Sequence, residues 1–89
     1  MRVVTTGINE SLIFHFEIDF QYVRVQFQTV TTFDRDGRHD GRVATCVYTN
    51  AFGLAFRDEI IDFDFEPNEQ NAKRLAIEAH EKYRSRREK

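Results

Sequence analysis

The segment TFDRDGRHDG, residues 32–41, is the stretch of this chain whose residue types first suggest metal binding. An EF-hand calcium loop places acidic residues at positions 1, 3 and 5, glycine at position 6 and glutamate at position 12. Asp34 and Asp36 match the first two positions. The match then fails, because Gly37 comes two positions too early and Thr45 occupies position 12.

Cations within and beside this segment also oppose a metal ion, since Arg35, Arg38 and Arg42 lie among the acids. A zinc site would have His39 alone, because no second histidine or cysteine follows at ligand spacing. The two Asp-Gly pairs are typical of turns, because glycine adopts positive φ without steric cost. We therefore predict a hairpin loop at about residues 34–41, longer than a minimal turn, that binds no metal or cofactor and can contact a partner.

The other reactive side chains do not form a catalytic constellation. The three histidines are scattered along the chain, and Cys46 lies within a predicted strand, as a small buried apolar residue would. Neither Ser11 nor Ser85 lies in a nucleophile-elbow motif, and the chain has no glycine-rich phosphate loop. The sequence predicts a protein that is not an enzyme.

Carboxylates alternate with apolar residues in IIDFDFE, residues 60–66. In an extended strand the carboxylates of this row stand about 6.6 Å apart on the wet face. Acids on a second predicted strand would widen the patch. Such a face suits a basic groove in a partner, including one that normally holds nucleic acid. The residues of this predicted acidic face are Asp62, Asp64, Glu66, Glu17 and Asp19.

Charge is divided unevenly along the chain. Residues 1–66 have eleven acidic and six basic residues, a formal charge of −5, whereas residues 67–89 have four and seven, a charge of +3. Ordinary solubility explains such a division, and basic residues also suit a helix C-terminus. The alternative function that the division suggests is nucleic-acid binding by the basic end. Its candidate residues are Lys82, Arg84, Arg86 and Arg87.

These candidate residues must be positioned by strands and one helix. In SLIFHFEIDF the even positions are apolar, whereas in YVRVQFQTV the apolar residues fall on odd positions. This reversal favours one long strand over about 12–30 with a β-bulge, because no turn residue lies at 20–22. Two strands joined by a strained turn are the second choice.

Further strands are predicted at RVVTT, with residues 7–10 as its turn, and at RVATCVYT, with NAFG as the turn that follows. LAFRDEIIDFDFE predicts one or two strands that end before Pro67. From Asn68, a plausible N-cap, the sequence is helical, and Ala72, Leu75, Ala76, Ala79 and Tyr83 form one narrow apolar stripe.

The prediction is a single α+β domain over residues 1–89: an antiparallel sheet of four to five strands at about 2–66 and one C-terminal helix at about 67–87 on its apolar face. The edges of such a sheet could pair in a homodimer. The predicted core is Leu12, Phe14, Phe16, Ile18, Phe20, Val23, Val25, Phe27, Val43, Val47, Ile61, Phe63, Leu75, Ala79 and Tyr83.

The composition fits a small cytoplasmic binding protein. Nine phenylalanines argue against disorder, and one cysteine excludes an internal disulfide. The sequence shows no signal peptide and no membrane-spanning run. In size and organisation the chain resembles small phage-encoded inhibitors, including anti-CRISPR proteins. That resemblance implies a viral protein that blocks another protein. The acidic face predicts that the partner offers a basic surface, such as that of a nucleic-acid-binding protein, and no membrane partner is expected.

Overall fold

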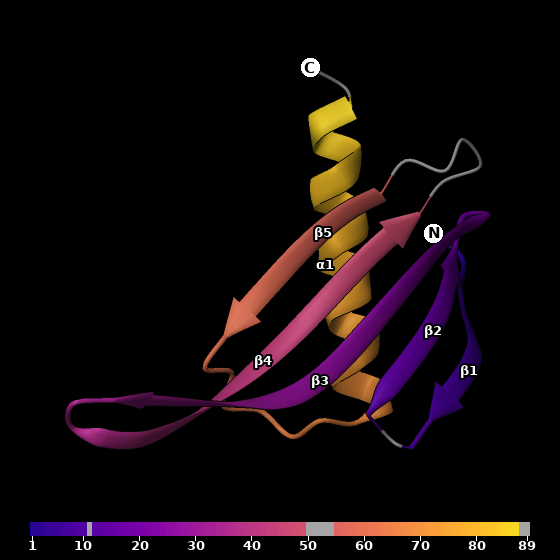
Figure 1. The fold of residues 1–89 in the computed structure, drawn as a ribbon. Coiled ribbons are helices and arrows are strands. Elements are labelled where there is room, and N and C mark those ends of the chain that lie inside the picture. Colours follow the sequence, from indigo (N-terminus) through magenta and orange to yellow (C-terminus); the bar gives the residue numbers. More distant parts are fainter. Residues whose placement is uncertain (11, 50–54, 88–89) are drawn as a thin grey trace.

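The computed structural model describes residues 1–10, 12–49 and 55–87. In this part of the chain, five antiparallel strands form one sheet in which each strand pairs with its chain neighbour (Figure 1). One helix lies against a face of this sheet, which confirms the predicted α+β class. The elements are β1 (Val3–Asn9), β2 (Ile13–Ile18), β3 (Gln21–Asp34), β4 (Gly37–Thr49), β5 (Ala55–Ile61) and α1 (Glu69–Arg87).

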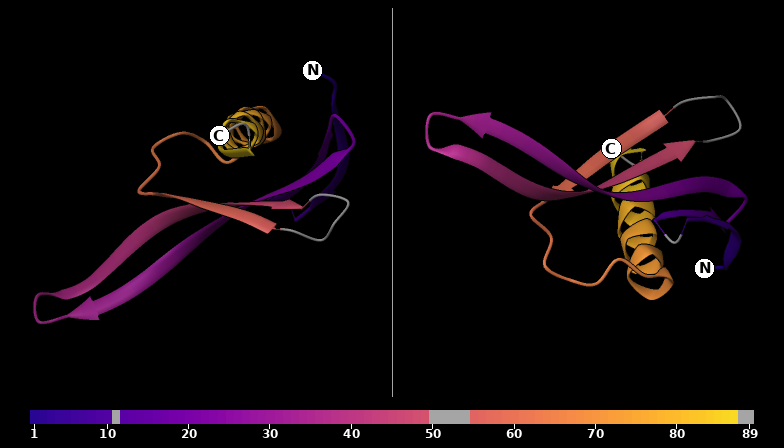
Figure 2. Two further views of the ribbon diagram at one scale, coloured as in Figure 1. Left: turned by 90° about the horizontal axis from the view of Figure 1, so that it is seen from above. Right: turned by 60° about the horizontal axis from the view of Figure 1, so that its bottom comes forward.

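The core lies between α1 and the curved sheet, which bends around the helix at the β1–β2 side (Figure 2). The helix contacts β2, β3 and β4. Cross-strand partners point to the same face, so the strand pairings of the buried residues identify the covered side of each strand. The buried apolar side chains of the sheet are Phe14, Phe16, Ile18, Val23, Val25, Phe27, Ala44, Cys46, Tyr48 and Phe56.

The predicted apolar stripe of the helix is confirmed, because all five of its residues are buried. The predicted cap is also present, since the Asn68 side-chain oxygen accepts a hydrogen bond of 2.8 Å from the backbone N–H of Asn71. Pro67 lies outside the helix, whose first residue is Glu69. Four of the stripe residues are alanine or leucine, so the helix can approach the sheet closely.

The opposite side of the sheet, here called the open face, has no layer over it among the described residues (Figure 2). The strand register identifies the side chains of the open face, because they alternate along each strand with the buried side chains. Its three main rows, read across the strands, are Val4, Glu17, Tyr22 and Thr49; Gly7, His15, Arg24, Val47 and Arg57; and Ile13, Gln26, Thr45 and Glu59.

A two-residue turn joins β2 to β3, so the prediction of one bent strand over 12–30 is wrong and the second choice is correct. Ile18 pairs with Gln21, and the two residues between them, Asp19 and Phe20, have φ of 49° and 69°. Two consecutive positive φ values are the mark of a type I′ hairpin turn. The Asp19 carboxylate fixes this turn by accepting a hydrogen bond of 2.9 Å from the backbone N–H of Arg2.

Phe20 is strained in this turn, because a bulky side chain at positive φ is uncommon and its ring is 81 % exposed. Phe20→Gly is expected to raise the free energy of unfolding by about 0.5–1 kcal/mol. The left-handed conformation costs an L-residue about 1–2 kcal/mol, and the flexibility of glycine in the unfolded chain offsets roughly 0.5–1 kcal/mol of that relief. Urea denaturation measures the change.

The matched control is Phe20→Ala, which removes the same ring and keeps the Cβ atom that causes the strain. It is expected to give no stabilisation. Equal stabilisation by alanine and glycine would assign the effect to loss of the exposed ring and would contradict backbone strain.

Five residues of the predicted core are not buried. Val43 and Val47 lie half-buried on the open face, because β4 has the opposite phase and buries Ala44, Cys46 and Tyr48 instead. Leu12 and Phe20 are exposed in the turns before and after β2. Ile61 is 67 % exposed, since it pairs with Val43 on the open face.

The predicted strand through Glu66 is also wrong, because β5 ends at Ile61. Asp62 has a φ of 58°, and its backbone N–H donates to the Arg42 carbonyl at 2.7 Å. Aspartate tolerates this left-handed conformation better than most residues. The chain therefore leaves the sheet at Asp62 and passes to the helix side.

Two predicted turns have different outcomes. Residues 7–9 continue β1 through an irregularity in register between Thr5 and Gly7, so the predicted turn at 7–10 is wrong and the chain turns beyond Asn9. The predicted turn NAFG lies at residues 50–53, outside the described residues. The sheet edges are β1 and β5, and pairing between copies along either edge stays a prediction.

Candidate protein-binding end and the residues around it

The hairpin of β3 and β4 continues well past the rest of the sheet (Figure 1). We call residues 29–41 the arm. Pairing continues without a break from Thr29 with Arg42 to Asp34 with Gly37, and residues 28–40 are all exposed. The arm gives the molecule a length of 45 Å and a radius of gyration of 14.3 Å, against about 12 Å for a compact domain of this size.

The tip of the arm is tighter than predicted. Strand pairing reaches Asp34 and Gly37, so the loop predicted at 34–41 is a two-residue turn at Arg35 and Asp36 followed by strand. The Asp34 carboxylate accepts a hydrogen bond of 2.8 Å from the Asp36 backbone, and Gly37 has a φ of 115°. Gly41 lies within β4, so only the first Asp-Gly pair forms the turn.

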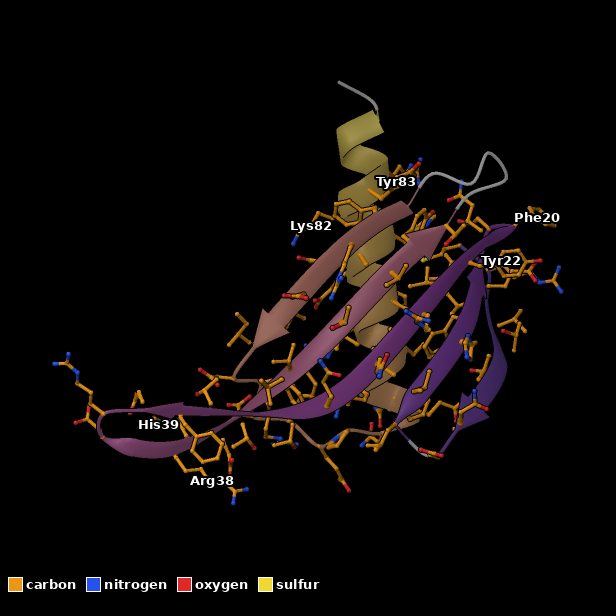
Figure 3. All side chains as sticks on the ribbon, in the orientation of Figure 1. Phe20, Tyr22, Arg38, His39, Lys82 and Tyr83 are labelled. Atoms are coloured by element: carbon orange, nitrogen blue, oxygen red, sulfur yellow. The ribbon has the colours of Figure 1, made fainter. Side chains whose placement is uncertain are left out.

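Side chains of the arm contact one another in pairs. The carboxylate of Asp40 contacts Arg38 at 3.0 Å and accepts a hydrogen bond of 2.9 Å from the Thr31 hydroxyl. The carboxylate of Asp34 lies 3.1 Å from His39 Nε2. Figure 3 shows Arg38 and His39 on the arm, away from the rest of the sheet. Across the described ranges, no three histidine, cysteine or acidic side chains are grouped as a metal site would require.

The acidic residues 62, 64 and 66 lie in the segment between β5 and α1, here called the acidic loop (residues 62–66). Their alternation with phenylalanine persists without a strand, because two rings anchor the loop: Phe63 packs on Phe27 with 5.3 Å between ring centroids, and Phe65 on Phe63 with 4.8 Å. The Arg42 guanidinium lies over the Phe63 ring at 4.3 Å. Phe63 is buried, whereas all three carboxylate residues are exposed.

The acidic loop and the base of the arm are adjacent. Asp62 is bonded through its backbone to Arg42, and its carboxylate lies beside Gly41. The arm has three aspartates and two arginines, and the acidic loop has three acids and no cation, so together they have a formal charge of −4. We call this surface the acidic end.

The other two residues of the predicted acidic face do not join it. Asp19 and Glu17 lie near the β2–β3 turn, at the end of the sheet where β5 starts, whereas the acidic loop follows the end of β5. The five carboxylates therefore occupy opposite ends of the sheet and do not form one face. Asp19 is also engaged, since its hydrogen bond from the Arg2 backbone lowers its pKa, and the positive charges of the N-terminus, His80 and Arg84 act in the same direction.

The basic end of the helix is partly engaged in contacts within the protein. The Lys82 amine contacts the Asp58 carboxylate at 2.7 Å. Arg84 is exposed beside Asp19 and Gln21. The helix backbone continues through Arg87, and the side chains of Arg86 and Arg87 lie outside the described part of the structure.

A buried polar contact between Tyr48 and His80 was not predicted. The Tyr48 hydroxyl and His80 Nδ1 share a hydrogen bond of 2.7 Å, and His80 Nε2 lies 3.5 Å from the Asp19 carboxylate. His80 is 5 % exposed and Tyr48 is fully buried. In the sequence, the only indication that the His80 side chain lies near the core was its position on the predicted helix, directly after the predicted core residue Ala79.

Cys46 is buried, as predicted. Burial raises the pKa of its thiol to about 12, and the negative charges of Asp58 and Glu78 add to the effect. A thiol is the weak form of the nucleophile, because the thiolate is the species that reacts. Cys46 therefore acts as a packing residue.

No protein family model matches this chain, and neither the curated proteins nor the solved structures include one with significant similarity. Within its described residues, no helix is both long enough and apolar enough to span a bilayer.

Proposed function

We propose that this is a small non-catalytic binding protein whose acidic end docks on a basic surface of a protein partner. The observation that supports this function is the projecting arm. An isolated two-stranded hairpin is marginally stable in water, and its exposed strand edges invite pairing with other chains. Every residue of the arm except Gly41 is exposed, so the arm contributes little to the core and its extension suits contact with a partner.

The negative charge of the acidic end favours a basic protein surface as the partner. Three carboxylate residues of the acidic loop and the aspartates of the arm are exposed, and a negative surface repels phosphate. A partner with clustered arginine or lysine gains both faster association and correct orientation from such a surface. Phe33, 77 % exposed near the arm tip, adds an apolar contact that an aromatic-lined or aliphatic pocket can receive.

The test is charge reversal at the acidic loop. Asp62→Lys with Asp64→Lys is expected to slow association and weaken binding to the partner retained from a host-cell extract by at least tenfold at 0.01–0.02 M salt. The loss is expected to shrink at 0.2 M salt, because the Debye length falls from about 30 Å at 0.01 M to below 10 Å. Surface plasmon resonance with the purified partner measures both rates.

The control reverses two exposed carboxylates elsewhere, Glu78→Lys with Glu81→Lys on α1. It changes the net charge by the same amount and leaves the acidic end intact. Equal weakening by both variants would show that only net charge matters, and unchanged binding in the first variant would overturn the proposed docking surface.

The biological role that we propose for this docking is inhibition, of the kind exerted by small phage-encoded inhibitors such as anti-CRISPR proteins. An acidic end that occupies a basic groove would exclude the nucleic acid that the groove holds. The protein is then expected to displace labelled nucleic acid from its partner in a competition assay. Simultaneous binding of nucleic acid and this protein to the partner would contradict inhibition by occupation and leave the docking proposal standing.

A further inference from the structure

The open face of the sheet contains a hollow far from the acidic end. Its volume is about 420 Å³, within the range of sites that hold small organic groups. It lies across β1 to β4 on the two rows nearest the β2–β3 turn. Its lining includes Gly7, His15, Tyr22, Arg24, Val47 and Thr49.

Gly7 helps to keep this hollow open, because it is the member of its row without a side chain. A Cβ atom at this position would contact the His15 ring at 3.5 Å. The register places Gly7 opposite His15, and His15 opposite Arg24. The absence of a side chain at Gly7 thus leaves space beside the His15 imidazole. The Arg24 guanidinium lies on the next strand.

Arg24 is the cation of this hollow. It is exposed and forms no ion pair with any of the described residues. The nearby carboxylates are Glu17, opposite Tyr22 in the adjacent row, Asp19 in the β2–β3 turn, and Glu59. Asp19 accepts a hydrogen bond from the Arg2 backbone, and Glu59 is held by Arg57 at 2.8 Å. An anionic group in the hollow would therefore lie on the Arg24 side, away from Glu17.

Two exposed aromatic rings border the same corner. Tyr22 is 61 % exposed on the open face, and Phe20 is the strained and highly exposed residue of the turn. Figure 3 shows both side chains together at the corner that the β2–β3 turn forms. Strained backbone that presents a side chain without packing it is typical of binding sites.

We propose that this corner of the open face binds single-stranded nucleic acid. Base stacking on an exposed ring of an open sheet is a common way to hold unpaired nucleotides, and it tolerates any sequence. Here one base stacks on Tyr22 over the hollow, Arg24 contacts the adjoining phosphate, and the next base contacts Phe20. A duplex is excluded, because its bases are already stacked on one another. This site is separate from the acidic end and does not depend on the function proposed for it.

The experiment measures fluorescence anisotropy of a labelled 12-nucleotide oligo(dT) with the full chain, at 0.02 and 0.15 M salt. Binding is expected for the single strand and not for a duplex of the same length or for a mononucleotide. Tyr22→Ala and Arg24→Ala are each expected to weaken binding on the order of tenfold. The affinity of Arg24→Ala is expected to fall less steeply with salt, because one phosphate contact is lost.

Two matched variants separate the site from general effects. Arg35→Ala removes another exposed arginine, at the arm tip, and is expected to leave oligonucleotide binding unchanged. Phe20→Gly relieves strain, so a variant that folds more stably and binds the strand more weakly cannot owe its loss to misfolding.

Several outcomes would overturn the proposal. These are no binding to the oligonucleotide, equal affinity for duplex or mononucleotide, and equal weakening by Arg24→Ala and Arg35→Ala. Loss of a protein partner in Tyr22→Ala, without any binding to the oligonucleotide, would instead assign the corner to a protein contact.

Discussion

Phe16→Ala is expected to lower the free energy of unfolding by about 3–5 kcal/mol. Phe16 lies in the middle of β2, is fully buried between the sheet and α1, and is among the largest fully buried side chains of the described residues. The truncation removes most of a phenyl ring and leaves a cavity that the sheet cannot close. Small domains have a total stability of about 5–15 kcal/mol, so this single change consumes much of the margin. Urea denaturation followed by circular dichroism measures it.

Phe33→Ala is the matched control, because it removes the same ring from an exposed position on the arm. Its expected effect is within about 0.5 kcal/mol. A loss below about 1 kcal/mol for Phe16→Ala, or similar losses for the two variants, would show that the core is not where the structure places it.

Tyr48→Phe is expected to cost about 1–3 kcal/mol, since it leaves the Nδ1 atom of buried His80 without its hydrogen bond. The ring and its contacts stay, including the contact with the tilted ring of Tyr83 at 4.4 Å between ring centroids. The loss therefore reports the polar contact and not the packing. The same denaturation assay applies, with a double-mutant cycle to His80→Phe for the coupling energy.

Tyr22→Phe removes a hydroxyl from an exposed tyrosine and is expected to change stability by less than about 0.5 kcal/mol. If Tyr48→Phe were as mild, the buried hydrogen bond would have no net value and His80 would be satisfied by another group.

Sequence patterns correctly predicted the parts of this fold in which apolar residues recur at a regular spacing. The alternation in β2 identified Phe14, Phe16 and Ile18 as buried, and the helical spacing identified the stripe on α1 together with its Asn68 cap. These features depend on neighbours within a few residues, which a sequence pattern displays.

The errors arose where distant residues decide the outcome. The turn at Asp19 and Phe20 depends on a hydrogen bond from Arg2, seventeen positions away, and phenylalanine itself gives no signal for positive φ. In β4 both faces are apolar, and valine looks more core-like than alanine. The buried set is nevertheless Ala44, Cys46 and Tyr48, which we attribute to the close approach of an alanine-rich helix.

The candidate sites were predicted in part. Exposure of Asp62, Asp64 and Glu66 followed from their alternation with phenylalanine, although the residues belong to a loop anchored by Phe63 and Phe65 and not to a strand. Their separation from Glu17 and Asp19 could not be predicted, because it depends on the order and direction of the strands. The corner at Tyr22 and Arg24 was missed for the same reason, since the residues of one row come from several strands.

The alternation of side chains along a strand restricts which changes in arm length keep the orientation of the arm tip. Side chains alternate along a strand, so deleting one residue from each of its strands would turn the tip to face the opposite side, and deleting two from each would restore it. Each such double step changes the reach by about 6.8 Å. The pairings that hold the core, such as Val25 with Cys46, lie outside the arm and keep their register. Insertions and deletions in the arm therefore change the surface of a partner that it reaches, while the buried residues keep their neighbours.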